Sequence, residues 1–385
     1  MIFDITPNPV IIFGEGAVLR TGKRMKEMGC KKVICITDKG IKNAGILEKV
    51  AENVRNAGLE VVEFDGVLPD PPDYKIEGCA ELAREEGIDS VIGLGGGSSM
   101  DTAKCVNILL TNPSPISQYY GPSGVQKETA LVLIPTTAGT GSELSIVSVV
   151  TDIENKRKSG CVGPAFLPDM AIIDPELTLG LPPAITACTG MDAFSHSAEA
   201  ITSGVANPVA DMEAEKAISL ICNNLPRVVK DGSNIEARTG MSLAASLGGV
   251  SGIKDSMVHF GHSLAHTMGS MYHNVPHGVF CALVIPEVIR DNAQVVPEKV
   301  KLIGEAMGLE MADNMSPREI GDKVAGAIKD LNNEIGIPSI EEIGIDESAI
   351  KDIVKIAYQD ETAIFAPEKL SYDHALKILM RVFEG

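Results

Sequence analysis

Residues 90–101 read SVIGLGGGSSMD, and this stretch decides the fold class. A short apolar run rich in β-branched residues, Ser90 to Leu94, leads directly into a triglycine turn, and a helical pattern follows. Such a turn lets backbone N–H groups approach a phosphate, and the dipole of the following helix favours negative charge there. A tight turn without a ligand is the alternative. The predicted pyrophosphate site comprises Gly95, Gly96, Gly97 and Ser98.

A second polar loop, PTTAGTGSE from Pro135 to Glu143, leaves the next predicted strand in the same manner. Two loops of this kind at neighbouring strand ends strengthen the nucleotide interpretation. Asp101, at the start of the helix after the glycine turn, and Ser142, in the second loop, are further candidates for cofactor binding. Alternatively, Ser98 and Asp101 match a capping box, in which Asp101 only accepts from helix N–H groups.

Strands and helices alternate over the first half of the chain. From Val33 to about Asp174, short β-branched runs alternate with amphipathic stretches, which implies a largely parallel sheet. The predicted strands are Val33–Thr37, Glu60–Phe64, Ser90–Leu94, Ala130–Ile134, Ile146–Thr151 and Met170–Ile173. The predicted helices are Ile46–Asn56, Pro72–Glu86 and Ser98–Leu110.

The second half has a different character. From about Leu181 onward the pattern is helical, with Pro or Ser starts, Gly stops and almost no strand signal. The Pro/Gly-rich segment IDPELTLGLPPA, residues 173–184, marks the change. We expect an α/β nucleotide-binding domain at residues 1–180 and an all-α domain that holds the catalytic metal at residues 181–385.

The composition limits the choice of partners. The chain carries 33 basic and 52 acidic residues, a net charge of −19, and has no Lys/Arg-rich run, which disfavours nucleic acid and anionic membranes. It has no secretory signal pattern and no run of about eighteen apolar residues. Its eight cysteines are dispersed without a CxxC pair, which favours reduced thiols. A cytoplasmic protein with a small ligand is expected.

The histidines predict a metal site. Five of the seven lie in the run HFGHSLAHTMGSMYHNVPHG, residues 259–278. Two of these, His262 and His266, are four residues apart and share one face of a helix, and the pair in MDAFSHSAE repeats that spacing. Three imidazoles and one carboxylate suit Fe, Zn or Co better than Ca or Mg. Partly buried histidines satisfied by hydrogen bonds are the alternative. The predicted ligands are Asp192, His196, His262 and His277.

Asp38 ends the first strand in VICITDKG. A carboxylate at this position can accept hydrogen bonds from ribose hydroxyls and repels a 2′-phosphate, which favours NAD over NADP. The alternative is an ordinary turn residue.

The motifs GGGSSMD, PTTAGTGSE, GMDAFSHSAEA and GHSLAHTMGSMYHNVPHG, in this order, resemble the iron-containing (group III) alcohol dehydrogenase family, as does FGEGAV near the start. The resemblance covers essentially the whole chain. It implies a dehydroquinate synthase-like fold, that is, an α/β dinucleotide-binding domain followed by an all-α domain.

The resemblance also implies roles for individual residues. The family's metal ligands match the four residues named above, and its additional active-site histidine, which relays a proton, matches His266. Thr136 and Thr137 match residues beside the adenosine half of the cofactor, and Asp38 matches the position that selects NAD. Lys158 matches a lysine near the nicotinamide ribose, although in the charged turn ENKRKSG it also fits a solvated hairpin.

One departure from the family pattern concerns the spacing of 15 residues between His262 and His277, one more than usual. We expect the extra residue, Asn274, to bulge in the turn before His277. His277 stays a predicted ligand, and neither His259 nor His273 receives a role.

The combined hypothesis is a metal-dependent NAD(H)-linked alcohol dehydrogenase that transfers hydride reversibly between nicotinamide and a small primary alcohol, diol or aldehyde. We expect Fe(II), with Zn possible, and a homodimer or larger homo-oligomer. Two related alternatives are a glycerol-dehydrogenase-like polyol oxidoreductase and a dehydroquinate-synthase-like lyase. The lyase is disfavoured because such enzymes need several Lys and Arg residues for a phosphorylated acidic substrate, and residues 188–203 and 256–281 contain neither. A non-catalytic nucleotide-binding protein is a third alternative.

Overall fold

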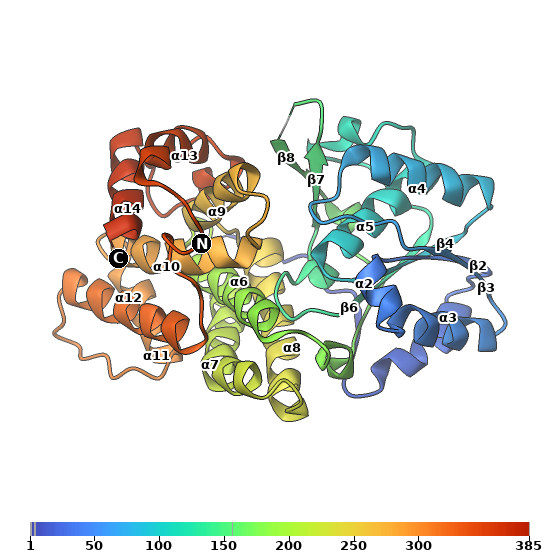
Figure 1. The fold of residues 1–385 in the computed structure, drawn as a ribbon, viewed down its shortest axis with the longest axis horizontal. Helices are drawn as coiled ribbons and strands as arrows, with labels where there is room; N and C mark the ends of the chain where they lie inside the picture. The colour runs from blue at the N-terminus through green and yellow to red at the C-terminus, as the bar shows by residue number, and fades with distance from the viewer. Residues whose placement is uncertain (1, 4, 156, 385) are drawn as a thin grey trace. The chain divides into compact units, whose positions relative to one another are not determined.

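The computed structural model describes residues 2–3, 5–155 and 157–384. Its internal contacts separate two compact units, Thr6–Gly180 and Leu181–Gly385. Figure 1 shows the first unit as a sheet with helices and the second as helices alone. The predicted fold class, a mostly parallel sheet followed by an all-helical region, is confirmed.

The first unit is built on a six-stranded sheet in the order β1-β9-β6-β4-β2-β3, with parallel pairing throughout. Its strands are β1 (Val10–Phe13), β2 (Lys32–Ile36), β3 (Glu60–Phe64), β4 (Ser90–Gly95), β6 (Ala130–Pro135) and β9 (Met170–Ile173). After β2 the chain continues to β3 at one edge of the sheet, and after β4 it continues to β6 on the opposite side. The carboxyl ends of β2 and β4 therefore flank the switch point at which ligands bind in such sheets.

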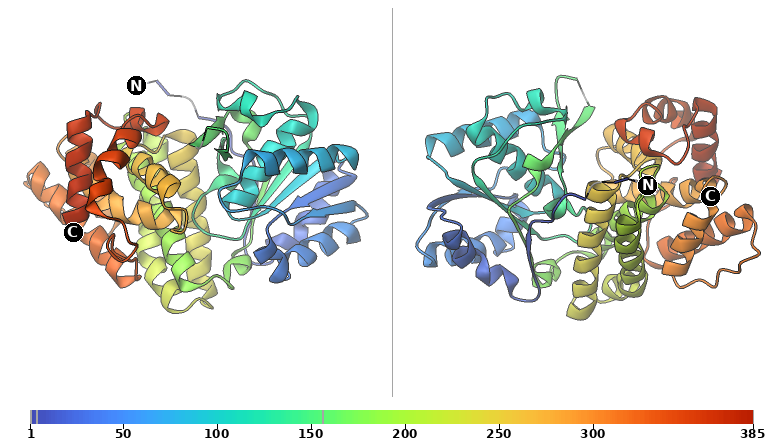
Figure 2. Two further views of the ribbon diagram at one scale, coloured as in Figure 1. Left: turned by 45° about the horizontal axis from the view of Figure 1, so that its top comes forward. Right: turned by 180° about the vertical axis from the view of Figure 1, so that it is seen from behind.

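Helices cover both faces of this sheet (Figure 2). They are α1 (Thr21–Glu27), α2 (Lys39–Asn43), α3 (Ile46–Asn56), α4 (Asp73–Glu85) and α5 (Gly97–Thr111). Successive residues of β2 enter opposite layers: Val33 and Cys35 pack in the core with α3, whereas Ile34 and Ile36 pack in the core with α4 and α5. This two-sided burial explains why the strands appear as continuous apolar runs instead of alternating patterns.

One predicted strand belongs elsewhere. Ile146–Thr151 is present as β7 (Val147–Asp152), but it lies in a separate three-stranded sheet with β8 (Arg157–Val162) and β5 (Gly121–Pro122). β7 and β8 are antiparallel neighbours. The expectation that this run continues the parallel alternation is therefore wrong, because the chain returns through a short hairpin and not through a crossover helix.

The second unit is helical throughout its described residues. Its main helices are α6 (Pro183–Thr202), α7 (Pro208–Lys230), α8 (Ile235–Val250), α9 (Phe260–Met271), α10 (His277–Asn292), α11 (Pro297–Ala306), α12 (Pro317–Glu334), α13 (Ile350–Ala357) and α14 (Tyr372–Glu384). A π-helical turn, Ser251–Asp255, continues α8. α6 packs against α7, α8 and α10, and it is buried along most of its length. Polar side chains on α6 therefore need partners within the protein.

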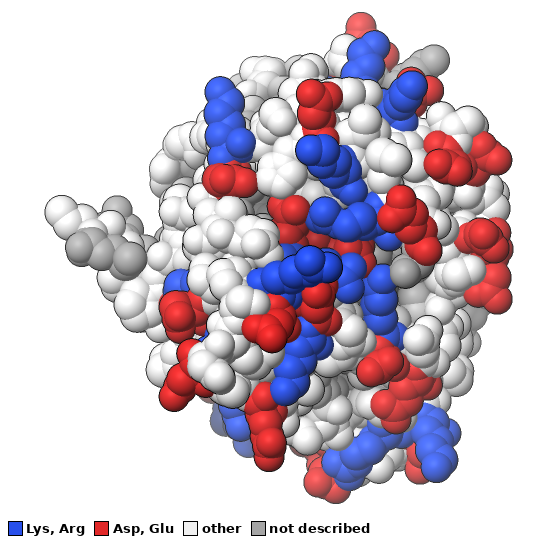
Figure 3. All heavy atoms as spheres, turned by 90° about the vertical axis from the view of Figure 1, so that its left-hand side faces the viewer, with Lys and Arg blue, Asp and Glu red and all other residues white. Residues whose placement is uncertain are grey.

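Ion pairs join the outer helices of this unit. The buried carboxylate of Glu287 on α10 contacts Arg290, Lys329 of α12 and Arg381 of α14, at 2.6, 2.9 and 3.3 Å. On the face drawn in Figure 3, basic and acidic side chains lie next to each other over much of the surface.

Glu213 on α7 gives a prediction of pH-dependent stability. Burial raises its pKa to about 7 from 4.5, with a further contribution from Asp255, and its Oε2 has no hydrogen-bond partner among the described residues. The folded state therefore binds more protons than the unfolded state between these two values, and stability falls as pH rises through that window. Glu213→Gln should raise the melting temperature near pH 8 and change it little near pH 4. Thermal melts across this range test it, and a difference independent of pH would contradict it.

Candidate active site

Helix α6 carries three buried polar side chains in less than three turns. Asp192 and His196 are four residues apart and Glu199 follows three later, so the three share one face of the helix. The side chains of Asp192 and His196 are each 6% exposed, and that of Glu199 is fully buried.

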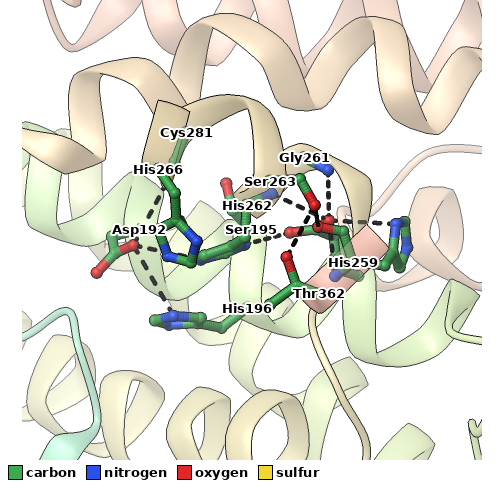
Figure 4. A network of polar contacts seen from close by, with 12 residues as sticks. Asp192, Ser195, His196, His259, Gly261, His262, Ser263, His266, Cys281 and Thr362 are labelled. Carbon is green, nitrogen blue, oxygen red and sulfur yellow. Dashed lines mark hydrogen bonds and ion pairs between the residues drawn. The ribbon is translucent and has the colours of Figure 1, made fainter. Parts of the chain in front are cut away.

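Helices α9 and α10 bring three more histidines to this face. Oδ1 of Asp192 lies 3.9 Å from Nε2 of His196 and 3.7 Å from Nε2 of both His262 and His277. Figure 4 shows the Asp192 carboxylate with dashed contacts to this cluster. The structure thus brings together all four ligands predicted from the sequence.

Glycine permits the close approach of α10 to α6. A Cβ atom on Gly278 would lie 2.0 Å from the carbonyl oxygen of Cys188, so no side chain fits there. Cys188 lies one helical turn before Asp192 on α6, and His277 directly precedes Gly278 on α10. The close contact therefore holds His277 near Asp192. Similarly, a Cβ on Gly252, in the π-helical turn, would lie 2.6 Å from the carbonyl oxygen of His196.

Glu199 holds the start of α9. Its Oε1 accepts from the backbone N–H groups of His259, Gly261 and His262 at 3.1, 2.7 and 3.3 Å, and its Oε2 makes a very short contact with Nδ1 of His262. Burial alone would raise the pKa of Glu199, but His262 and His259 lower it to about 2. The ionised carboxylate accepts from Nδ1–H of His262 and thereby turns Nε2 toward Asp192.

Two histidines without a predicted role differ in their surroundings. His259 is fully buried, with Nε2 at 2.9 Å from Oγ1 of Thr202 and Nδ1 at 3.2 Å from Glu199, and burial lowers its pKa. Its backbone N–H donates to the Glu199 carboxylate, whereas its Nδ1 makes no hydrogen bond within the described residues. His273 is exposed in the turn between α9 and α10, and so is Asn274, the residue expected to bulge there.

The four donors fit a divalent cation. Oδ1 of Asp192 lies 3.7–3.9 Å from each of the three Nε2 atoms, too far for hydrogen bonds. Ligand atoms about 2.1 Å from a shared tetrahedral ion lie about 3.4 Å from one another. Burial lowers the pKa of His196 to about 4, which keeps its imidazole neutral, and its buried Nδ1 has no partner within the described chain. Burial alone would raise the pKa of Asp192, but the imidazoles, His196 foremost, hold it well below its ordinary value. One carboxylate oxygen with three imidazole nitrogens around it is a set of donor atoms that a divalent cation stabilises.

Sequence reasoning missed Cys281. It follows His277 by four residues on α10 and is buried, and its Sγ lies 3.6 Å from Oδ1 of Asp192 and 3.4 Å from Nε2 of His277. Burial raises the pKa of this thiol to about 12, so it is protonated as it stands. The spacing rule that paired Asp192 with His196 also pairs His277 with Cys281 and was sufficient to find it.

His266 lies beside this cluster. Its ring stacks on that of His277 with centroids 5.3 Å apart, and its Nδ1 lies 3.8 Å from Oδ2 of Asp360. Burial would raise the pKa of Asp360, but His266 and Thr362 lower it to about 2, so the residue is an anion beside the imidazole. The side chain of His266 is 26% exposed and therefore open to proton exchange with water. Asp360 was also missed, since a contact across 94 residues has no local signal.

In the first unit, the two predicted loops lie side by side. A Cβ on Gly97 would be 2.9 Å from Cγ2 of Thr140, and one on Gly96 would be 3.5 Å from Thr137. Gly96 caps α5 without a side chain, and the first turn of α5 has no acidic residue, so no side-chain oxygen competes with an anion at this helix start. Thr136 donates its backbone N–H to Gly95, and its buried Oγ1 has no partner among the described residues.

Asp101 and Ser142 bind each other. Oδ1 of Asp101 accepts from Oγ of Ser142 at 2.6 Å, and Oδ2 accepts from the backbone N–H of Val149 at 3.0 Å. The capping-box alternative is wrong, because α5 begins at Gly97 and Asp101 lies a full turn inside it. The pair ties α5 to the second loop and to β7. Direct contact of either residue with a cofactor stays a prediction.

The other two predicted cofactor residues have local partners. Oδ1 of Asp38 caps α2 by accepting from Gly40 and Ile41, and its Oδ2 lies only at the limit of a hydrogen bond, 3.5 Å from Oγ of Ser99. Asp38 is thus a helix cap that keeps one oxygen largely available. Lys158 lies in β8, and its Nζ is 2.7 Å from Oδ1 of Asp70. As the hairpin interpretation requires, Lys158 lies in an antiparallel pair of strands.

The model of the family described as iron-containing alcohol dehydrogenase matches residues 8–175, and the model of its C-terminal region matches residues 186–383. The chain belongs to the iron-containing alcohol dehydrogenase family. It is 36% identical to an NAD-dependent methanol dehydrogenase of Bacillus methanolicus, over 91% of this chain and 92% of that protein. It is also 36% identical to a 1,3-propanediol dehydrogenase of Klebsiella pneumoniae, over 99% of both chains. A crystal structure of a 1,3-propanediol oxidoreductase aligns with a TM-score of 0.95, covering 100% of both chains.

Membership of the iron-containing alcohol dehydrogenase family confirms the predicted class of activity: this is a metal-dependent oxidoreductase that acts on alcohols with NAD. Within the described residues, no helix is both long enough and apolar enough to cross a membrane.

The contact between Glu199 and His262 predicts an effect on metal affinity. Glu199→Gln keeps a group that accepts from the backbone N–H groups but removes the charge that orients His262, so metal affinity should fall about 10–100-fold. Competition with a chelator measures this. Ser195→Ala is a matched control on α6, because the Ser195 hydroxyl donates to the carbonyl of Met191 in the same helix. Equal metal affinity in wild type and Glu199→Gln would contradict the assignment.

Proposed function

We propose that this member of the iron-containing alcohol dehydrogenase family interconverts small primary alcohols or diols and their aldehydes, with a divalent ion held by Asp192, His196, His262 and His277. The observation that carries the proposal is the convergence of three imidazole nitrogens on the buried carboxylate of Asp192, each within 3.9 Å of its Oδ1. The methanol and 1,3-propanediol dehydrogenases among its relatives, and a lactaldehyde reductase of Escherichia coli that is 34% identical, support a small substrate.

The donor set accommodates Fe(II), and Zn binds the same ligand types. When bound, the metal supplies Lewis acidity toward the substrate oxygen. The protein's part is to keep Asp192 ionised and His196 neutral, and to fix His262 through Glu199. These contacts position the donors before any ion arrives.

His266 handles the proton in this proposal. The bound nicotinamide would supply the hydride chemistry, and during oxidation His266 would accept the proton of the alcohol hydroxyl and pass it to water. The reverse path supplies a proton to the aldehyde oxygen. Asp360 orients the ring and stabilises it when protonated, which is the task of a carboxylate beside a general base.

The first unit is proposed to bind NAD. The N-terminus of α5 and the residues Gly95 to Ser98 receive the pyrophosphate, and the available oxygen of Asp38 accepts from a ribose hydroxyl. The remaining predicted contacts are Asp101, Thr136, Thr137, Ser142 and Lys158. Among them, the buried Oγ1 of Thr136 is the atom whose hydrogen-bonding capacity is unused in the described structure.

We further propose a cytoplasmic homodimer or larger homo-oligomer. All eight cysteines are free thiols, in keeping with a reducing compartment. Light scattering of the purified protein measures its assembly.

Loss of a ligand gives the central test. His262→Ala should remove bound metal, and it should lower kcat for methanol, propanol and 1,3-propanediol about a thousandfold, the worth of several kcal/mol of transition-state stabilisation. Metal analysis after anaerobic purification and NADH absorbance measure the two effects. His273→Ala is the matched control, since that histidine is exposed in the neighbouring turn. A His262→Ala enzyme with full metal content and turnover would overturn the proposal.

The cofactor assignment is tested at Asp38. Asp38→Ala removes the charge that repels a 2′-phosphate, so the ratio of kcat/KM with NADPH to that with NADH should rise about tenfold, equivalent to about 1.4 kcal/mol. Asp65→Ala is a control, because Asp65 directly follows β3 and pairs with Lys42. A ratio that does not change in Asp38→Ala would place the ribose elsewhere.

A further inference from the structure

Cys281 lies among the proposed metal ligands. Its Sγ is 3.4 Å from Nε2 of His277, 3.6 Å from Oδ1 of Asp192 and 4.0 Å from Nε2 of His262. Each of these four residues offers one ligand atom, and the four atoms lie within 4.8 Å of one another. Figure 4 shows the Cys281 side chain pointing toward Asp192 and His262 from the neighbouring helix.

His196 lies at the edge of this group and not inside it. Its Nε2 is 3.9 Å from Oδ1 of Asp192, and its ring stacks on His262 with centroids 4.6 Å apart. It is buried, and its Nδ1 has no partner among the described residues. The most compact set of donors around Asp192 therefore contains the thiol of Cys281 in place of the imidazole of His196.

We propose that Cys281 is a metal ligand, so that Asp192, His262, His277 and Cys281 surround the ion and His196 is the fifth donor. The inference rests on the metal site of the proposed function and adds a sulfur to it. On binding, the thiol proton is released to solvent and a metal–thiolate bond takes its place.

A hydrogen bond from the thiol to Asp192 is the competing explanation. A single S–H group can donate to one acceptor at a time, yet three acceptors face this sulfur at 3.4–4.0 Å. Two of them, on His262 and His277, are atoms that the site already commits to an ion. A sulfur bound to the same ion as these three atoms would lie close to all of them, and no hydrogen bond to any of them would be needed.

The thiolate changes which ion the site prefers. Two anionic donors, Asp192 and Cys281, neutralise a dication, and thiolate is a softer ligand than imidazole or carboxylate. Thiolate ligands are typical of zinc sites. Compared with a site of one carboxylate and three imidazoles, this site should therefore favour Zn over Fe(II). The metal bound by this chain then depends on a residue outside the four predicted ligands.

X-ray absorption of the zinc-loaded, full-length wild-type protein tests the proposal without any substitution. A sulfur neighbour at about 2.3 Å from Zn is expected, beside nitrogen and oxygen at about 2.0–2.2 Å. A zinc shell of nitrogen and oxygen alone would overturn it.

Variants supply a second test. Protein stripped of metal and reloaded with Co(II) should show a thiolate-to-cobalt charge-transfer band in the near ultraviolet, which Cys281→Ser should lose. The same variant should bind Zn about 10–100-fold more weakly and show a lower Zn-to-Fe(II) affinity ratio. Cys188→Ser is the matched control, since this buried thiol on α6 donates to the Ile185 carbonyl of its own helix. Thermal melts establish that both variants fold.

The outcomes separate this inference from the proposed function. A wild-type protein that oxidises alcohols with bound metal but has no sulfur signal, or a Cys281→Ser protein with an unchanged cobalt spectrum, would refute the sulfur ligand and leave the function standing. A wild-type protein that binds no divalent ion would refute both.

Discussion

The helical unit depends on one buried anion, the carboxylate of Asp192. A charge in a place that water hardly reaches costs several kcal/mol unless it is compensated. Imidazoles on α6, α9 and α10 converge on this carboxylate, and the ion of the proposed function would compensate its charge, so the three helices must meet at this point. Glu199, the second buried anion of α6, is satisfied differently, by backbone N–H groups at the start of α9. Together the two carboxylates fix where α9 begins and which nitrogen of His262 points inward.

Much of this site was predictable because helix geometry is local. A spacing of four residues places two side chains on one face, which was enough to pair Asp192 with His196 and to select His262. The same rule found no partner for Glu199 or Asp360, since their contacts with His262 and His266 span 63 and 94 residues. Such contacts follow from the packing of whole helices, and a single sequence does not encode packing in any short window.

In the sheet, too, the strands could be predicted from local sequence, whereas the pairing of one strand depends on the tertiary fold. Strands buried on both faces are recognisable from their apolar runs, and five of the six predicted strands lie in the large sheet. The sixth has the same composition but pairs in a hairpin. The adjacency of the two polar loops follows from register, because Gly95 of β4 is paired with Pro135 of β6, and each loop starts where its strand stops. The capping alternative for Asp101 failed because a helix start depends on where the backbone turns, here at Gly96.

The crowding of functional side chains on α6 has a consequence for how the protein can change over time. Asp192, His196 and Glu199 lie on one rigid helix. A rotation of α6 that improved the contacts of one of these side chains would therefore misplace the other two. The turn between α9 and α10 is under no such constraint: its exposed residues, His273 and Asn274, lie outside the packed core, and α10 is anchored after the turn by the contact of Gly278 with α6. Insertions and deletions are therefore tolerated in the turn between α9 and α10, because an inserted residue there leaves the atoms that face the proposed metal in place. An insertion within α6 would displace them.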